Sequence, residues 1–131
     1  MEIHQSTEDY LEAILMIQER KGYVRSVDVS NQLGVSKPSV SYTTKKLRES
    51  NYIAFNEDGM ITLTESGRLI AEKTFAKHKL FTDLFKYLGV PDEIAAEDAC
   101  RIEHVLSPET FDAICKYINS TGLDLSKSLE A

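Results

Sequence analysis

The sequence has no tryptophan, only two cysteines and three prolines, and no apolar run that approaches the length of a membrane span. A helix needs about 20 mostly apolar residues to cross a bilayer, so we expect neither a membrane-spanning segment nor a membrane partner. The start of the chain, Met1-Glu-Ile-His-Gln, is not a signal peptide, which makes the cytoplasm the expected location. Cysteines in such a chain are expected to remain reduced thiols.

Basic residues are also in short supply, because 15 lysines and arginines face 21 acids and leave a formal net charge of -6. This balance argues against indiscriminate binding to nucleic acid. The charge is unevenly spread, however. Residues 36–50 carry four bases against one acid, whereas residues 88–131 carry nine acids against three bases. A basic segment attached to an acidic one suits a DNA-reading module joined to a part with another task.

Apolar periodicity and turn residues predict a mainly α-helical fold with one small β-hairpin. Ser6 can cap the first helix, which ends near Gly22, and Asp58-Gly59 is a strong hairpin turn. The expected elements are a helix at 7–20, a short helix ending at Gly34, a helix from Ser36 to Leu47, two strands within 52–64, helices at 64–88, 91–106 and 109–118, and a loosely ordered tail at 119–131.

The pair of helices around Gly34 has the pattern of a helix-turn-helix, because its second helix is rich in hydroxyls and lysines. Val40, Thr43 or Thr44, and Leu47 are expected to face inward at helical spacing. The hairpin that follows makes the unit a winged helix, although its tip is acidic. An ordinary helical hairpin with a solvated face is the alternative. The side chains expected to meet DNA are Arg25, Ser36, Lys37, Pro38, Ser39, Ser41, Tyr42, Lys45 and Lys46.

The segment Cys100-Arg-Ile-Glu103-His104 lies in the helix expected at 91–106. Residues three and four apart share a helix face, so a thiolate, a carboxylate and an imidazole would project together. Such a trio can bind a transition metal but lacks the paired cysteines of a structural zinc site. A core cysteine beside a surface Glu and His is the alternative. For Asp9 and Glu12, on the first helix, the alternative is a pair of solvated acids favoured by the helix dipole.

Together these segments resemble the diphtheria toxin repressor family, and within it the short manganese transport regulator branch. The resemblance runs from Ser6 to about Ile118 and is carried by the order and spacing of TEDYLEAI, GVSKPSVSYTTKKL, LTESG, KHKLFTDLF and CRIEHVLSPE. Members of this family are homodimeric repressors that bind operator DNA when loaded with Fe(II) or Mn(II). The resemblance implies a winged helix-turn-helix DNA-binding domain at 1–64, a helical metal-binding and dimerisation domain at 65–131, and a palindromic operator.

The resemblance also implies a set of metal ligands. Asp9 and Glu12 match the manganese branch, whereas His78, Glu103 and His104 match positions common to both branches. At Cys100 the manganese branch has a bridging Glu and the iron branch has a Cys, so this chain is a hybrid. A thiolate does not bridge hard cations as a carboxylate does, and it shifts preference toward Fe(II), Co(II) or Zn(II). The expected activating ion is Fe(II) or Mn(II), with Co(II) and Zn(II) possible in vitro and no organic cofactor.

The sequence leaves three alternative functions for this chain. The first is a metal-activated DNA-binding repressor that controls metal homeostasis. The second is a winged-helix transcriptional regulator that does not respond to metal. The third is a metalloenzyme, but the sequence contains no HExxH zinc-protease motif and no Gly-rich phosphate loop, so we expect no enzymatic activity.

Overall fold

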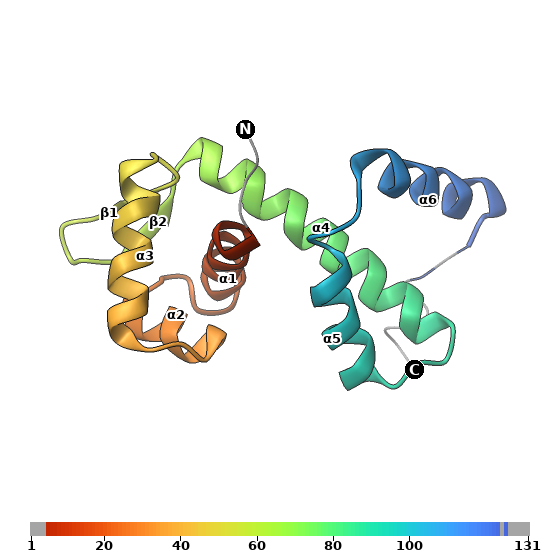
Figure 1. Cartoon of the computed structure of the whole chain (residues 1–131), viewed down its shortest axis with the longest axis horizontal. Helices are drawn as coiled ribbons and strands as arrows, with labels where there is room; N and C mark the ends of the chain where they lie inside the picture. The colour runs from red at the N-terminus through yellow and green to blue at the C-terminus, as the bar shows by residue number, and fades with distance from the viewer. Residues whose placement is uncertain (1–4, 124, 126–131) are drawn as a thin grey trace. The chain divides into compact units, whose positions relative to one another are not determined.

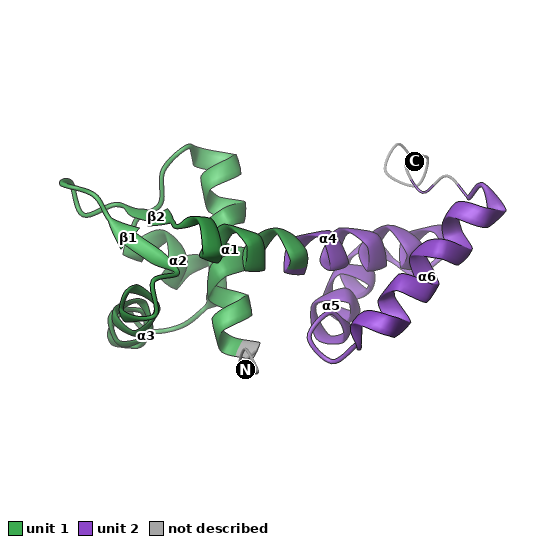
Figure 2. Ribbon diagram, turned by 90° about the horizontal axis from the view of Figure 1, so that it is seen from above, with its two compact units in different colours: residues 1–73 green, residues 74–131 purple. Residues whose placement is uncertain are grey.

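The structure, a computed structural model, describes residues 5–123 and residue 125 and confirms a mainly helical fold with one β-hairpin. The chain divides into two compact units, residues 1–73 and 74–131 (Figure 2). The boundary predicted from the sequence, after residue 64, stays a prediction. The elements, in chain order, are α1 (Gln5–Lys21), α2 (Ser26–Leu33), α3 (Lys37–Glu49), β1 (Ile53–Phe55), β2 (Ile61–Leu63), α4 (Glu65–Tyr87), α5 (Asp92–Ile102) and α6 (Pro108–Thr121) (Figure 1).

Helix α1 supplies the core of unit 1. Its apolar stripe is buried as predicted, with Leu11, Ile14 and Ile17 almost inaccessible to solvent, and the helix packs on α2 and β2. The backbone N–H of Ile61 donates to the carbonyl of Val24 at 2.8 Å, which ties β2 to the loop after α1. The predicted cap was wrong: α1 begins at Gln5, so Ser6 lies within the helix.

The helix-turn-helix is built from local turn chemistry. Gly34, with φ +66°, ends α2 and donates its N–H to the carbonyl of Ser30 at 2.9 Å. The side chain of Ser36 caps α3 by accepting the N–H of Ser39 at 3.3 Å. Within α3 the buried hydroxyl is that of Thr44, which donates to the carbonyl of Val40 at 2.7 Å. Only one side of α3 is therefore used for the core, and the other remains exposed.

The wing is the antiparallel pair of β1 and β2, in which Ile53 lies opposite Leu63. Gly59 adopts φ +77° at the turn. The side chain of Asn56 accepts the backbone N–H groups of Asp58 and Met60 at 2.9 and 3.0 Å. These hydrogen bonds stabilise a tight turn at the tip of the hairpin, where Asp58-Gly59 predicted one.

Gly67 allows the start of α4 to approach the loop between α3 and β1. A Cβ atom at this position would overlap the backbone carbonyl of Tyr52. The same junction is tied by the hydroxyls of Thr64 and Ser66, which donate to the carbonyl of Asn51 at 2.7 and 3.0 Å. The close approach is therefore set by the backbone carbonyl of Tyr52 facing Gly67 and by the hydrogen bonds from Thr64 and Ser66 to Asn51.

We therefore expect Gly67→Ala to lower the free energy of unfolding by roughly 1–3 kcal/mol, the usual cost of overpacking. Urea unfolding followed by circular dichroism measures this value. Lys73→Ala, at an exposed position of α4, is the control and should stay within about 0.5 kcal/mol of wild type. A glycine-to-alanine change in an unobstructed helix stabilises by about 0.4–1 kcal/mol, so a gain in stability would contradict the close contact.

Unit 2 is organised around Phe81 of α4, which is only 2% exposed. Its ring stacks on Phe85 and meets Phe111 of α6 edge to face, both with centroids 6.1 Å apart. Ala95 and Ala99 of α5 are fully buried. None of the helices in the described part of the chain has the length and apolar content needed to cross a membrane.

Two helix ends in unit 2 differ from the prediction. α5 ends at Ile102 rather than Leu106, because a tight turn follows in which Val105 N–H donates to the carbonyl of Ile102 at 3.2 Å. Ser107 must then be extended to precede Pro108 and cap α6. α6 continues to Thr121, so the expected loosely ordered tail was wrong for residues 119–121. Residues 124 and 126–131 of that tail lie outside the described part of the chain.

Candidate metal centre and nucleic-acid interface

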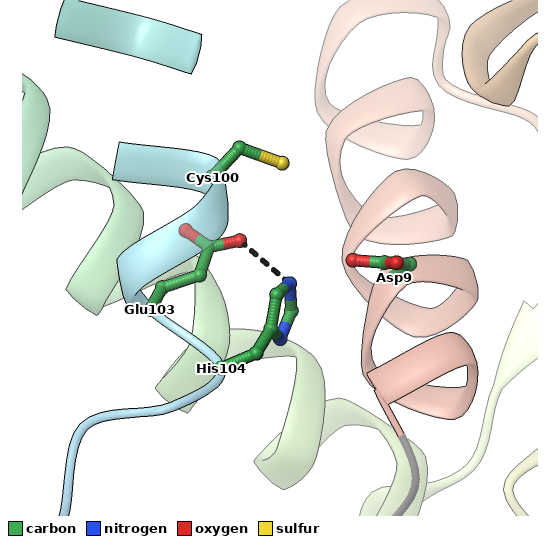
Figure 3. Close-up of side chains that lie close together, drawn as sticks. All are labelled: Asp9, Cys100, Glu103 and His104. Carbon is green, nitrogen blue, oxygen red and sulfur yellow. Dashed lines mark ion pairs between the residues drawn. The ribbon is translucent and has the colours of Figure 1, made fainter. Parts of the chain in front are cut away.

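A buried carboxylate lies at the centre of the metal-binding candidates of unit 2. Glu103, the C-cap of α5, is 1% exposed. Its Oε2 atom lies 3.0 Å from Nδ1 of His78 on α4. Its Oε1 atom lies 3.2 Å from Nε2 of His104 (Figure 3). The carboxylate is therefore flanked by an imidazole on each side.

The end of α5, rather than one continuous helix face, brings the predicted trio together. Cys100 stands in the last turn of α5, Glu103 caps the helix, and His104 follows in the turn (Figure 3). One ligand atom from each of these side chains lies within 4.8 Å of the others. Cys100 is an exposed residue and forms no disulfide, so this cysteine is not the core residue of the alternative interpretation.

The donor set of unit 2 fits a divalent transition-metal ion. Among the described residues, none donates a hydrogen bond to Oε1 of Glu103, although that atom is buried. A buried carboxylate oxygen without a donor is unfavourable, and coordination to a cation would satisfy it. Imidazole suits Zn, Cu, Fe and Ni, a carboxylate suits harder ions, and a thiolate favours softer ones. The combination of O, N and S donors therefore fits Fe(II), Co(II) or Zn(II) better than Mg(II).

Asp9 and Glu12 belong to α1 of unit 1, three residues apart on that helix. Glu12 is buried, with 6% of its surface exposed, and Asp9 is half-buried. The alternative of two solvated acids therefore does not hold for Glu12. Burial of a carboxylate is costly unless it is paired or coordinates a metal, so Glu12 keeps its place among the candidate ligands.

The candidate DNA-binding surface is the exposed side of α3 with its capping residue. Every side chain predicted to meet DNA is exposed, including Tyr42 at 63%. The ammonium of Lys46 lies 4.5 Å from the centroid of the Tyr42 ring. The exposure of this surface was predicted correctly; its contact with DNA stays a prediction.

A second basic group surrounds Tyr23, before α2. The ammonium of Lys21 and the guanidinium of Arg25 lie 4.9 and 5.5 Å from the centroid of its ring. Asp28 accepts Lys21 Nζ at 2.7 Å and the backbone N–H of Arg25 at 2.9 Å. The hydrogen bond from Lys21 lowers the pKa of Asp28, and the same bond raises the pKa of Lys21. Of this group only Arg25 was among the side chains predicted from the sequence to meet DNA.

Two domain families match this chain. The metal binding and dimerisation domain of the iron dependent repressor matches residues 64–124, and the N-terminal DNA binding domain of the iron dependent repressor matches residues 2–60. Together they span both of the units described above.

Relatives of similar length are transcriptional regulators by name. The HTH-type transcriptional regulator MntR of Shouchella clausii is 37% identical over 109 residues, which cover 83% of this chain and 76% of the relative. The regulator of the same name from Bacillus velezensis is 34% identical over 125 residues, which cover 95% of this chain and 88% of the relative.

Solved structures share the fold. The crystal structure of T. acidophilum IdeR superposes with a TM-score of 0.76 at 30% identity and covers 95% of this chain and 56% of that one. A manganese-dependent transcriptional repressor in complex with manganese gives a TM-score of 0.77 at 28% identity, with 86% and 52% covered. The chain spans about half the length of these solved proteins.

Proposed function

Because this chain belongs to the family of iron-dependent repressors, we propose that one set of side chains holds the divalent ion that switches on its binding to operator DNA. The chain itself is a metal-dependent DNA-binding transcriptional repressor of metal homeostasis and not an enzyme. The proposed ligands are Asp9, Glu12, His78, Cys100, Glu103 and His104. One observation carries the proposal: the buried carboxylate of Glu103 faces two imidazoles, and no described residue donates a hydrogen bond to its Oε1 atom.

The six proposed ligands rest on two kinds of support: contacts within unit 2 for some, and the resemblance to the manganese branch for others. His78, Glu103 and His104 are supported by their contacts within unit 2, and Cys100 by its place beside them. Asp9 and Glu12 are proposed from the resemblance to the manganese branch, with the burial of Glu12 as an independent argument. A bound divalent cation supplies the positive charge that offsets the repulsion among these acidic side chains.

We propose Fe(II) as the favoured ion, with Co(II) and Zn(II) able to replace it in vitro and Mn(II) bound less well. The reason is Cys100, because a thiolate prefers these ions to Mn(II). Relatives that are named for manganese favour Mn(II) instead. If Cys100 did not coordinate the ion, Mn(II) would be the expected ion for this chain as well.

On the DNA side, we propose that a homodimer acts in the cytoplasm and reads a palindromic operator. A twofold axis would place two copies of α3 about 34 Å apart, or a multiple of that distance, in successive major grooves. Pro38 can pack on a thymine methyl, whereas the hydroxyls near it and Lys37, Lys45 and Lys46 meet phosphates.

The test is DNA binding with and without metal. We expect protein loaded anaerobically with Fe(II) to select palindromic duplexes from a random pool and to bind them about 5–150-fold more tightly than protein in chelator, the usual range of allosteric coupling. Co(II), Zn(II) and Mn(II) are compared in the same assay. Equal affinity in metal and in chelator would contradict the proposal and support the regulator that does not respond to metal.

A further inference from the structure

We propose that Tyr42 is a positioning residue for Lys46, and that its ring holds the lysine ammonium ready for a DNA phosphate. The two residues stand four apart on α3, so their side chains share one face of the helix. Both are exposed, and the ammonium lies 4.5 Å from the centroid of the ring. This inference deepens the proposed function and rests on it, because it requires α3 to meet DNA.

The ring gives the side chain of Lys46 an order that an exposed lysine otherwise lacks. A free lysine side chain has a large rotamer entropy, part of which is lost when its ammonium meets a phosphate. A cation within about 6 Å of a tyrosine ring centroid is attracted to the face of the ring. Holding Lys46 there before DNA arrives reduces the ordering that binding requires.

Lys46 differs in this respect from the other lysines of α3. In the part of the chain that the structure describes, neither Lys37 nor Lys45 has its ammonium over an aromatic ring. Nor does Lys46 form an ion pair with any carboxylate of the described residues. The ring engages one side of its ammonium and leaves the charge available to an anion. Lys45, adjacent in sequence and also exposed, is therefore a matched control.

This role predicts a different result from base reading by Tyr42. A residue that reads a base contributes to one position of the operator, so its loss is sequence-selective. A residue that positions a phosphate contact contributes to every duplex, and its effect disappears once the lysine is gone. The two roles are therefore separated by comparing operator with unrelated DNA and by testing for coupling between the two residues.

The experiment is a double-mutant cycle on metal-loaded protein. Dissociation constants are measured at several salt concentrations, on a selected operator and on an unrelated duplex, for Tyr42→Leu, Lys46→Ala and the double variant. Tyr42→Leu is repeated in a Lys45→Ala background, and Tyr42→Phe retains the ring. Thermal denaturation monitors folding, which exposed substitutions should leave unchanged.

We expect Lys46→Ala to weaken binding to both duplexes and to reduce the salt slope by about one. Tyr42→Leu should weaken both duplexes by about two- to fivefold, as an exposed cation–π pair implies. It should do so in wild type and in the Lys45→Ala background but not once Lys46 is absent. Tyr42→Phe, which keeps the ring over Lys46, should lose less affinity than Tyr42→Leu.

Additive effects of Tyr42→Leu and Lys46→Ala would overturn the inference, as would a loss confined to the operator. A different outcome would count against the proposed function instead. If Lys46→Ala bound both duplexes as tightly as wild type with an unchanged salt slope, the assignment of this lysine to a phosphate would be wrong, and the positioning role of Tyr42 would fall with it.

Discussion

Glu103→Gln is expected to abolish the stabilisation of this protein by metal and the metal dependence of its DNA binding, while the metal-free protein remains at least as stable as wild type. The substitution keeps the shape of the side chain and removes its charge. Removing a direct ligand should weaken metal binding by at least the roughly 10–100-fold that loss of an outer-shell partner costs. Metal at about 100 times its dissociation constant stabilises a protein by about 2.7 kcal/mol, and most of that gain should vanish in the variant.

The expected stability of the metal-free variant follows from the surroundings of the carboxylate. Glu103 is 1% exposed, and its Oε1 atom receives no hydrogen bond from any described residue. An unsatisfied buried group costs about 1–3 kcal/mol, and more when it is charged. Glutamine brings no charge into this site, and its amide can donate toward Nε2 of His104. Without metal, Glu103→Gln therefore removes the cost of an unsatisfied buried charge. With metal, the same substitution removes a ligand.

Thermal denaturation with and without Co(II) or Fe(II), together with DNA binding, measures both effects. Glu97→Gln is the matched control, because Glu97 is exposed on the same helix and pairs only at the surface with Arg101 at 3.3 Å. That variant should respond to metal like wild type. A Glu103→Gln protein that kept its metal-induced rise in melting temperature would exclude Glu103 as a ligand. Lower stability without metal would instead identify the carboxylate as a structural acceptor for His78.

Local features of this fold were predictable because local chemistry decides them. Gly34 and Gly89 end helices in left-handed conformations, and Ser36 and Ser107 cap helices whose first turn holds a proline. Asp58-Gly59 forms the hairpin turn. Each of these signals involves only a few consecutive residues and needs no knowledge of the core.

The errors arose where neighbouring signals competed. Ser6 was a plausible cap, yet α1 already includes it. Leu106 was placed in a helix because its apolar neighbours continue the periodicity, whereas α5 ends at Ile102 in a tight turn before the extended Ser107 that precedes Pro108. These differences change the site, since Glu103 and His104 stand at a helix end and in a turn.

The candidate metal site was only partly predictable. Helical spacing indicated that Cys100, Glu103 and His104 would share a region, but nothing in the spacing showed that Glu103 is buried. Its contact with His78 joins residues 25 apart in sequence, and pairing at that distance depends on how α4 packs with the end of α5. The resemblance to a known family supplied His78, and the structure supplied its partner.

Cys100→Ser is expected to remove a sulfur-to-metal charge-transfer band from the Co(II)-loaded protein and to weaken Co(II) binding by at least about tenfold, the lower end of the loss seen for outer-shell partners. The band is expected in wild type because Cys100 forms no disulfide and its sulfur lies within 4.8 Å of ligand atoms of Glu103 and His104. Serine keeps the size of the side chain but replaces a soft donor with a weak hard one. Cys115→Ser on α6 is the control, because it removes the other thiol and should leave the band unchanged.

Cys100→Glu tests the same assignment in the opposite direction. The manganese branch has a glutamate at this place, and a carboxylate can span two ions where a thiolate does not bridge hard cations. The variant should therefore bind Mn(II) with greater occupancy and lose part of its preference for Fe(II) or Co(II). Metal content after dialysis against equal concentrations of the ions measures this change directly. If wild type with Co(II) shows no sulfur band and Cys100→Ser keeps its metal-dependent DNA binding, the thiolate is not a ligand. Cys100 would then contribute at most its backbone carbonyl, the remaining donors would be oxygen and nitrogen, and Mn(II) would replace Fe(II) as the expected activating ion.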